Sequence, residues 1–167
     1  MSDVSVPPMA AEGGSVERVR AALRAAGHPD AVEAFPEGTR SAADAAAAVG
    51  CTVAQIAKSV VFRAGERPVL VIASGANQVD TAKVAALTGL KIGRAEGAWV
   101  RAVTGFAIGG VAPLGHQTLP VVLVDKDLFA HDRIWAAAGS PRHVFASTPG
   151  ELLRISGGRR ADVALRG

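Results

Sequence analysis

The sequence predicts a single α/β (α+β) domain built on a mixed β-sheet that is surrounded by short helices. Two apolar runs, 68–73 and 121–125, have the length and continuity of strands that are covered on both sides. Segments with helix-capping signals lie before and between such runs, which is typical of a sheet flanked by helices. A turn at 65–67 joins two strands without a helix, so the sheet should be mixed and not purely parallel.

Composition indicates a globular protein with one core. The chain has 167 residues, of which 49% are hydrophobic and 20% charged, a balance that excludes wholesale disorder. Aromatic residues make up only 4%, so the core must rely on small and branched aliphatic side chains, and stacking platforms for single-stranded nucleic acid are not expected. The formal net charge of +3 is compatible with a polyanionic partner without requiring one.

Cys51 is the only cysteine, which rules out an intramolecular disulfide or a cysteine metal cluster. Because free cysteines are usually buried and inert, we interpret Cys51 as a small core residue and not as a nucleophile. The histidines have no partner at helical i,i+4 spacing, so no zinc site is expected. No segment has the character of a signal sequence or a membrane span, so we expect a cytoplasmic protein.

Residues 1–14 mix Pro, Gly, Ala and acidic residues without a period, and we expect them to be a disordered tail that precedes a domain over 15–167. An apolar stripe predicts a helix over 15–26, which Gly27 ends. A short strand is expected over 32–35, ended by Pro36-Glu37-Gly38.

Caps and turns define the middle of the chain. The expected elements are a helix over 42–49 capped by Ser41 and Asp44, a one-turn helix over 53–57 capped by Thr52 and Gln55, a strand over 58–63, and a strand over 68–73. The hairpin formed by these two strands is the expected centre of the sheet. In the first strand of the hairpin, Lys58 shares a face with Val60 and Phe62. A lysine is therefore the first residue on an otherwise apolar face of the strand.

The second half of the chain alternates helix and strand signals. The expected elements are a helix over 81–87 between Asp80 and Gly89, an edge strand over 91–93, a helix over 96–103, strands over 121–125, 134–138 and 143–146, a helix from Thr148 through Arg154, and a closing segment over 159–165. The whole chain would then contain about six strands and five short helices.

The strongest site candidate is the glycine-rich loop over 104–116. Paired glycines such as Gly109-Gly110 permit positive φ and close approach of the backbone, while Pro113 fixes its own φ and extends Ala112. Successive free N–H groups in such a loop form a nest for a carbonyl oxygen, an oxyanion or a phosphate. We therefore expect Gly110 to have a positive φ and to face a ligand; the alternative is an ordinary turn between strands.

Lys58 is the second candidate. A lysine at the start of a strand is usually a solvated end, because buried lysines are rare. Its place on an apolar face favours instead a lysine that enters a pocket, where it could orient a phosphate or an ester.

Several motifs carry a family resemblance when they are taken together. They are Gln55-Ile56-Ala57-Lys58-Ser59, then Asp80-Thr81-Ala82-Lys83 with Gly89, then Thr104-Gly105-Phe106-x-x-Gly109-Gly110-Val111-Ala112-Pro113-Leu114-Gly115, then Asp125. In this order and spacing the chain resembles, from about Val16 to Ala164, the YbaK/EbsC family of free-standing aminoacyl-tRNA deacylases, which are related to the editing domain of prolyl-tRNA synthetase. The resemblance implies a mixed, mostly antiparallel sheet surrounded by short helices.

The resemblance also implies a reaction and a site. It implies a trans-editing hydrolase that deacylates mischarged aminoacyl-tRNA, of a tRNA(Pro) type carrying a small amino acid. The implied catalytic residues are Lys58, Gly109 and Gly110, and the implied substrate-binding residues are Val111, Ala112, Pro113 and His143. Because the ester is already activated, positioning it and polarising its carbonyl could suffice without metal, cofactor or covalent nucleophile.

The implied partners are aminoacyl-tRNA and an aminoacyl-tRNA synthetase, with neither membrane nor DNA. The alternative is a non-catalytic module of the same fold that binds tRNA, a synthetase or a small ligand. Three departures from the family pattern leave the edited amino acid open: Ala112 replaces a Ser of some members, Arg40-Ser41 replaces an aromatic residue, and the segment 137–144 differs from that of members that edit cysteinyl-tRNA. Pocket size alone discriminates one methylene by only about 1–3 kcal/mol.

Overall fold

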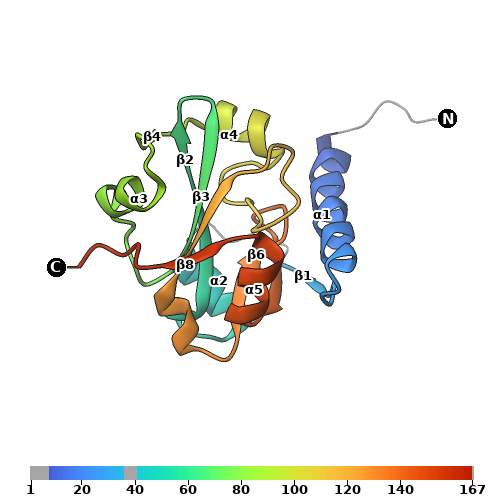
Figure 1. Ribbon diagram of the computed structural model, residues 1–167. Coiled ribbons are helices and arrows are strands. Elements are labelled where there is room, and N and C mark those ends of the chain that lie inside the picture. Colours follow the sequence, from blue (N-terminus) through green and yellow to red (C-terminus); the bar gives the residue numbers. More distant parts are fainter. Residues whose placement is uncertain (1–7, 36–40, 167) are drawn as a thin grey trace.

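The computed structural model describes residues 8–35 and 41–166, and its centre is one mixed β-sheet with helices packed on both faces (Figure 1). The strands are β1 (Val32–Ala34), β2 (Ile56–Ala64), β3 (Arg67–Ser74), β4 (Gly93–Arg94), β5 (Val121–Asp125), β6 (Ile134–Ala137), β7 (His143–Ser147) and β8 (Arg159–Ala161). Their order is β1-β7-β6-β2-β3-β5-β8, and β4 pairs with β2. The predicted mixed sheet with the β2–β3 hairpin at its centre is confirmed.

The pairings explain why the sheet is mixed. Neighbours along the chain, such as β2 with β3 and β6 with β7, pair antiparallel, as do β1 with β7 and β2 with β4. The pairs β2–β6, β3–β5 and β5–β8 are parallel, and each is joined by a crossover that contains a helix.

Three of the five helices begin and end where the sequence places caps. They are α1 (Pro8–Ala25), α2 (Ala42–Val49), α3 (Thr81–Thr88), α4 (Gly97–Thr104) and α5 (Pro149–Ser156), with 3₁₀ turns η1 (Val53–Gln55) and η2 (Lys126–Ala130). The predicted N-caps are present, because the side chains of Ser41, Asp80 and Thr148 accept hydrogen bonds from backbone amides in the first turns of α2, α3 and α5. The five predicted helices are thus confirmed, whereas η2 was not anticipated.

Several boundaries differ from the prediction. The helix expected over 53–57 ends at Gln55, so Ile56 and Ala57 belong to β2. The first helix begins at Pro8 and not at Ser15, so the expected tail over 1–14 is helical from Pro8 onward. Proline is tolerated in a first helical turn, and the alanines that follow favour a helix strongly enough to continue through Gly13-Gly14. The edge strand expected over 91–93 is Gly93–Arg94, and the closing segment contributes β8, which raises the strand number to eight.

Residues 1–7 of the expected tail and the turn Pro36-Glu37-Gly38 lie outside the described residues. Within the described part of the chain, no helix combines the length and apolarity that crossing a bilayer requires.

The core has one large and two smaller parts. The largest lies between the sheet and helices α1, α4 and α5, where Val19, Leu23 and Phe106 are almost completely buried. On the opposite face α3 covers β3 and β5, and α2 covers β6 and the start of β2. Small aliphatic side chains dominate all three parts, as the composition predicts.

One irregularity of the sheet positions the site. β2 pairs with β6 only at Ile56 and Ala57, and with β4 only at Phe62 and Arg63. Among the described residues, the stretch 58–61 therefore has no strand partner on the side away from β3. Residues 58–61 are partly exposed at this gap.

Candidate functional site

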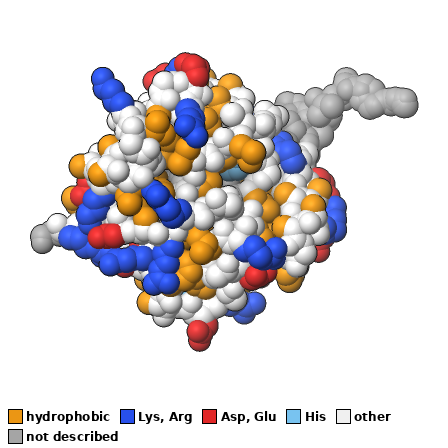
Figure 2. Space-filling model, viewed as in Figure 1, with side chains coloured by type: hydrophobic (Ala, Val, Ile, Leu, Met, Phe, Trp, Pro, Cys, Tyr) orange, Lys and Arg blue, Asp and Glu red, His pale blue; other side chains and the backbone are white. Residues whose placement is uncertain are grey.

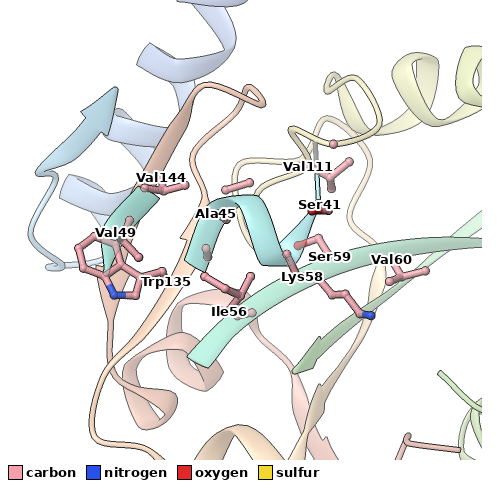
Figure 3. Close-up of a pocket in the computed structure, with 15 residues that line it drawn as sticks. Ser41, Ala45, Val49, Ile56, Lys58, Ser59, Val60, Val111, Trp135 and Val144 are labelled. Atoms are coloured by element: carbon pink, nitrogen blue, oxygen red, sulfur yellow. The ribbon is translucent and has the colours of Figure 1, made fainter. Parts of the chain in front are cut away.

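A pocket of about 260 Å³ opens at the gap in the pairing of β2 (Figure 3). Its walls come from α2, β2, the loop after α4, β6 and β7. Most of the lining is apolar and is formed by Ala42, Ala45, Val49, Ile56, Trp135 and Val144. The polar side chains that line it are those of Ser41, Lys58 and Ser59. The pocket thus combines a hydrophobic chamber with a short polar edge.

Lys58 lies on that polar edge, half-buried on β2. Burial lowers the pKa of its amine below the ordinary value, and the negative charge of Asp125 opposes this shift. Asp125 is completely buried and accepts hydrogen bonds from the Ser74 amide at 3.0 Å and from Asn77 Nδ2 at 2.9 Å. Because the buried carboxylate is fixed, it provides a constant field that favours the charged form of Lys58.

Ser59 is a pocket residue that sequence reasoning missed. Its hydroxyl is buried and has no hydrogen-bond partner among the described residues. Figure 3 shows Ser59 on the side of β2 that faces Ser41 and Val111, while Lys58 extends toward the other side. Strand alternation placed Ser59 on the face opposite Lys58, but an unpaired strand edge can be reached from both faces, so adjacent residues line one pocket.

The glycine-rich loop contributes Gly109 and Val111 to the lining of the same pocket. The Gly110 amide donates to the Ala107 carbonyl at 2.9 Å, which closes a tight turn with Gly109 at φ 92°. The expectation of a positive φ at Gly110 is wrong: that conformation belongs to Gly109. Gly110 is required for another reason, since a Cβ there would lie 2.6 Å from Ser140 Cα.

Fewer backbone amides of the loop are free to bind a ligand than the sequence led us to expect. The Gly110 amide is used within the turn, and Pro113 has no N–H to offer. Val111 and Ala112 are 4% and 0% exposed, and within residues 8–35 and 41–166 their amides donate to no carbonyl or side chain. Ala112 lies behind the pocket, whereas Gly109 and Val111 line it, and the Gly109 amide likewise donates to no carbonyl or side chain in the described part of the chain. The amides of Gly109 and Val111 are therefore the loop donors that a ligand atom could engage.

Helix α1 holds both ends of this loop. Arg18 donates from Nε to the Gly115 carbonyl at 2.9 Å and from Nη2 to the Gly105 carbonyl at 3.0 Å. Its guanidinium also stacks 4.5 Å above the centroid of the Phe106 ring. One side chain outside the loop thus ties its first and last glycines together.

His116 fixes the loop from within. Its Nε2 lies 2.6 Å from the Ala112 carbonyl, and its ring meets Phe106 edge to face at a centroid distance of 5.3 Å. Because a carbonyl only accepts, Nε2 carries the proton of this hydrogen bond. Its position directly after Gly115, the last loop glycine, is the one sequence signal that could have identified His116.

The structure brings only some of the predicted site residues together. Lys58, Gly109 and Val111 line the pocket, whereas Gly110, Ala112 and Pro113 are buried within the loop behind it.

His143 does not line the pocket. Its Nδ1 lies 2.6 Å from the hydroxyl of Ser140, which also accepts from the Arg142 amide. The substrate-binding role of His143 stays a prediction.

Cys51 packs against the cluster under α2, and burial raises the pKa of its thiol. Cys51 is only partly buried, so it lies at the edge of the core and not within it as expected. Its raised pKa argues against a nucleophile, because the thiolate is the nucleophilic form. In the part of the chain that the structure describes, no three His, Cys, Asp or Glu side chains are placed to hold a metal ion.

Comparison with known proteins identifies the family. Residues 36–155 match the family of the aminoacyl-tRNA editing domain. The uncharacterized protein YwhH of Bacillus subtilis (strain 168) is 32% identical over 126 residues, which cover 75% of this chain and 80% of YwhH.

Solved structures share the fold. A protein described as a proposed trans-editing enzyme for prolyl-tRNA synthetase superposes with a TM-score of 0.86 at 40% identity, over 97% of this chain and 100% of that chain. The hypothetical protein APE2540 has the same fold, with a TM-score of 0.81 at 24% identity, over 89% of this chain and 99% of the other. The resemblance to deacylases of the editing type is confirmed at the level of the family: the chain belongs to the aminoacyl-tRNA editing domain family.

Proposed function

We propose that this protein is a trans-editing hydrolase that deacylates mischarged aminoacyl-tRNA in the cytoplasm. The observation that carries the proposal is that Lys58, Gly109 and Val111 line one largely apolar pocket, in a chain of the editing-domain family. A pocket of this kind holds an apolar group in its chamber while polar groups at its edge orient the atoms that react.

The reaction needs a positioned ester and a water. Water adds to the ester carbonyl, the bond to the terminal ribose oxygen breaks, and the free amino acid and the tRNA hydroxyl are released. The amides of Gly109 and Val111 stabilise the negative charge that develops on the carbonyl oxygen. Lys58 holds a phosphate or hydroxyl of the terminal nucleotide, and the neighbouring ribose hydroxyl assists proton transfer. Neither a metal nor a thiol takes part in this mechanism.

The proposed substrate is a tRNA of the tRNA(Pro) type that carries a small amino acid. The relative described as a proposed trans-editing enzyme for prolyl-tRNA synthetase supports the choice of tRNA. The apolar wall supports an uncharged side chain, because a charged one would be desolvated there without a partner. A synthetase is the proposed protein partner.

A deacylation assay over a panel of mischarged tRNAs tests the proposal. We expect hydrolysis of at least one tRNA(Pro) species that carries a small amino acid, with slower release of correctly attached proline. Lys58→Ala, matched for fold by circular dichroism, serves as the control for background hydrolysis.

The alternative function is a non-catalytic module that binds tRNA, a synthetase or a small ligand. Binding of tRNA without any turnover above the Lys58→Ala background would favour this alternative and overturn the hydrolase.

A further inference from the structure

A second cavity, of about 390 Å³, lies beside β4 and shares one lining residue, Val60, with the site pocket. Its apolar lining includes Val60, Phe62 and Ile92, and its polar side chains are Thr81 and Arg94. Figure 3 shows Val60 on the same side of β2 as the Lys58 amine. The two cavities therefore follow one another along the free edge of β2.

Two cations mark the ends of this path. Lys58 lines the pocket, and Arg94 stands opposite Phe62 in the β2–β4 pair. Phe62 lies four residue steps along the extended strand from Lys58, a span of about 13 Å. That span exceeds one nucleotide, so a ligand that touches both cations must continue beyond the terminal nucleotide.

Arg94 is available for a ligand. Its side chain is exposed and makes no ion pair among the described residues. Two acidic residues adjoin lining residues of the second cavity in sequence: Asp80 precedes Thr81, and Glu96 follows Ala95. The carboxylate of Asp80 accepts from the amides of Ala82 and Lys83 at the start of α3, and Glu96 is exposed two residues after Arg94.

The more conspicuous basic surface lies elsewhere. Figure 2 shows Lys and Arg side chains gathered over β8 and the segment that follows it. Several of these charges are already compensated, because Arg166 pairs with Asp127 and Asp162, and Lys83 also pairs with Asp162. β3 and β5 also separate β8 from β2. That surface is therefore poorly placed for an RNA whose end enters the pocket.

We propose that the single-stranded 3′ end of the RNA leaves the site pocket along β2, and that Arg94 binds a phosphate upstream of the terminal nucleotide. The inference rests on the proposed function and adds the path of the RNA. Single strands bind through cations that contact phosphates and through flat apolar surfaces that receive bases. The second cavity offers both: Arg94 can contact a phosphate, and aliphatic side chains together with the single aromatic ring of Phe62 can receive a base.

The test compares a long substrate with a short one. The variant is Arg94→Ala, and the matched control is Arg160→Ala, which removes an exposed arginine from β8. The substrates are the mischarged tRNA and the same amino acid esterified to adenosine. We expect Arg94→Ala to raise KM for the tRNA about fourfold at roughly 0.15 M salt and to reduce the salt slope of binding by about 0.7. KM for the adenosine ester should not change, and Arg160→Ala should behave as the parent protein on both substrates.

The inference is overturned if Arg94→Ala binds tRNA as the parent protein does, if both substrates weaken equally, or if Arg160→Ala gives the larger loss. Failure of the proposed function looks different, because the parent protein would then hydrolyse neither substrate. In that case the dissociation constant for tRNA, measured by filter binding, still decides the path, since the same fourfold loss is expected for Arg94→Ala alone.

Discussion

Gly110 lies against the backbone of Ser140 so closely that a methyl group on Gly110 would stand 2.6 Å from Ser140 Cα. Ser140 belongs to the turn between β6 and β7, and both strands line the pocket. The contact therefore sets the distance between the glycine-rich loop and the opposite wall of the site. A glycine is required at 110 for close approach, and at 109 for its positive φ.

Gly110→Ala should destabilise the protein by about 1–3 kcal/mol, because the backbone of Ser140 cannot yield as a side chain would. Urea unfolding monitored by circular dichroism measures the loss. Gly150→Ala is the matched control, since a Cβ there meets nothing within 4 Å and its φ is not positive. Equal stability of Gly110→Ala and the parent protein would show that the loop moves away from β7 at little cost.

Lys58→Ala should keep the fold and lose deacylation by at least about 10²-fold, the loss typical for one group that orients or stabilises the reacting charge. Burial lowers the pKa of this amine, so the folded protein bears a desolvation cost that the variant removes, and stability should hardly change. Single-turnover deacylation beside a thermal melt separates the two effects. A large drop in melting temperature with parental turnover would reassign Lys58 to a structural role.

Arg18→Lys should loosen the loop although it keeps the charge. A lysine cannot reproduce the fork that reaches Gly105 and Gly115, nor stack on Phe106 in the same way. We expect a stability loss of about 1–3 kcal/mol together with slower deacylation per folded molecule. Arg24→Lys on the same helix is the control: its pair with Asp30 is exposed to solvent and should contribute little to stability. Equal losses of stability and activity in the two variants would contradict a specific role of Arg18 in fixing the loop.

Much of the fold is readable from the sequence because its signals are local. Ser41, Asp80 and Thr148 cap helices where the capping patterns place them, and the β2–β3 hairpin follows from alternation and a turn. The start of α1 was misplaced because Gly13-Gly14 reads as a breaker, while the flanking residues favour the helix.

The site is less predictable, since it depends on contacts between distant segments. Lys58 and Gly109 were identified as site residues, but no local pattern reveals that Gly110 would meet Ser140 or that Arg18 would bridge two glycines. Ser59 was missed because alternation argues against it, and only the unpaired edge of β2 admits it to the pocket. The φ of Gly110 was misassigned because sequence does not distinguish which of two adjacent glycines occupies the turn.

Cys51→Ala should leave deacylation unchanged, as should treatment with a chelator, because the proposed chemistry uses neither thiol nor metal. The thiol packs beside α2 and its pKa is raised, so its loss should affect only packing, by about 1 kcal/mol or less. Initial rates with and without chelator, for the parent and the variant, provide the measurement. Lost turnover in either arm would require a different mechanism.

His116 should make stability depend on pH below its ordinary pKa of 6.5. Burial lowers the pKa of this imidazole and the charge of Arg18 adds to the effect, while the hydrogen bond to Ala112 opposes it. Nε2 already carries the proton donated to Ala112, so an additional proton must go to Nδ1, which is buried and has no partner among the described residues.

In the unfolded chain His116 takes up its proton near pH 6.5, whereas in the folded protein it does so only at lower pH. The unfolded state therefore binds more protons in this window, and the free energy of unfolding must fall as the pH falls from about 6.5 toward the lower folded pKa. His116→Gln retains an amide that can donate to Ala112 but does not titrate. Urea unfolding at a series of pH values should give a shallower decline for the variant than for the parent protein, and parallel curves would mean that the loop accommodates the imidazolium without cost.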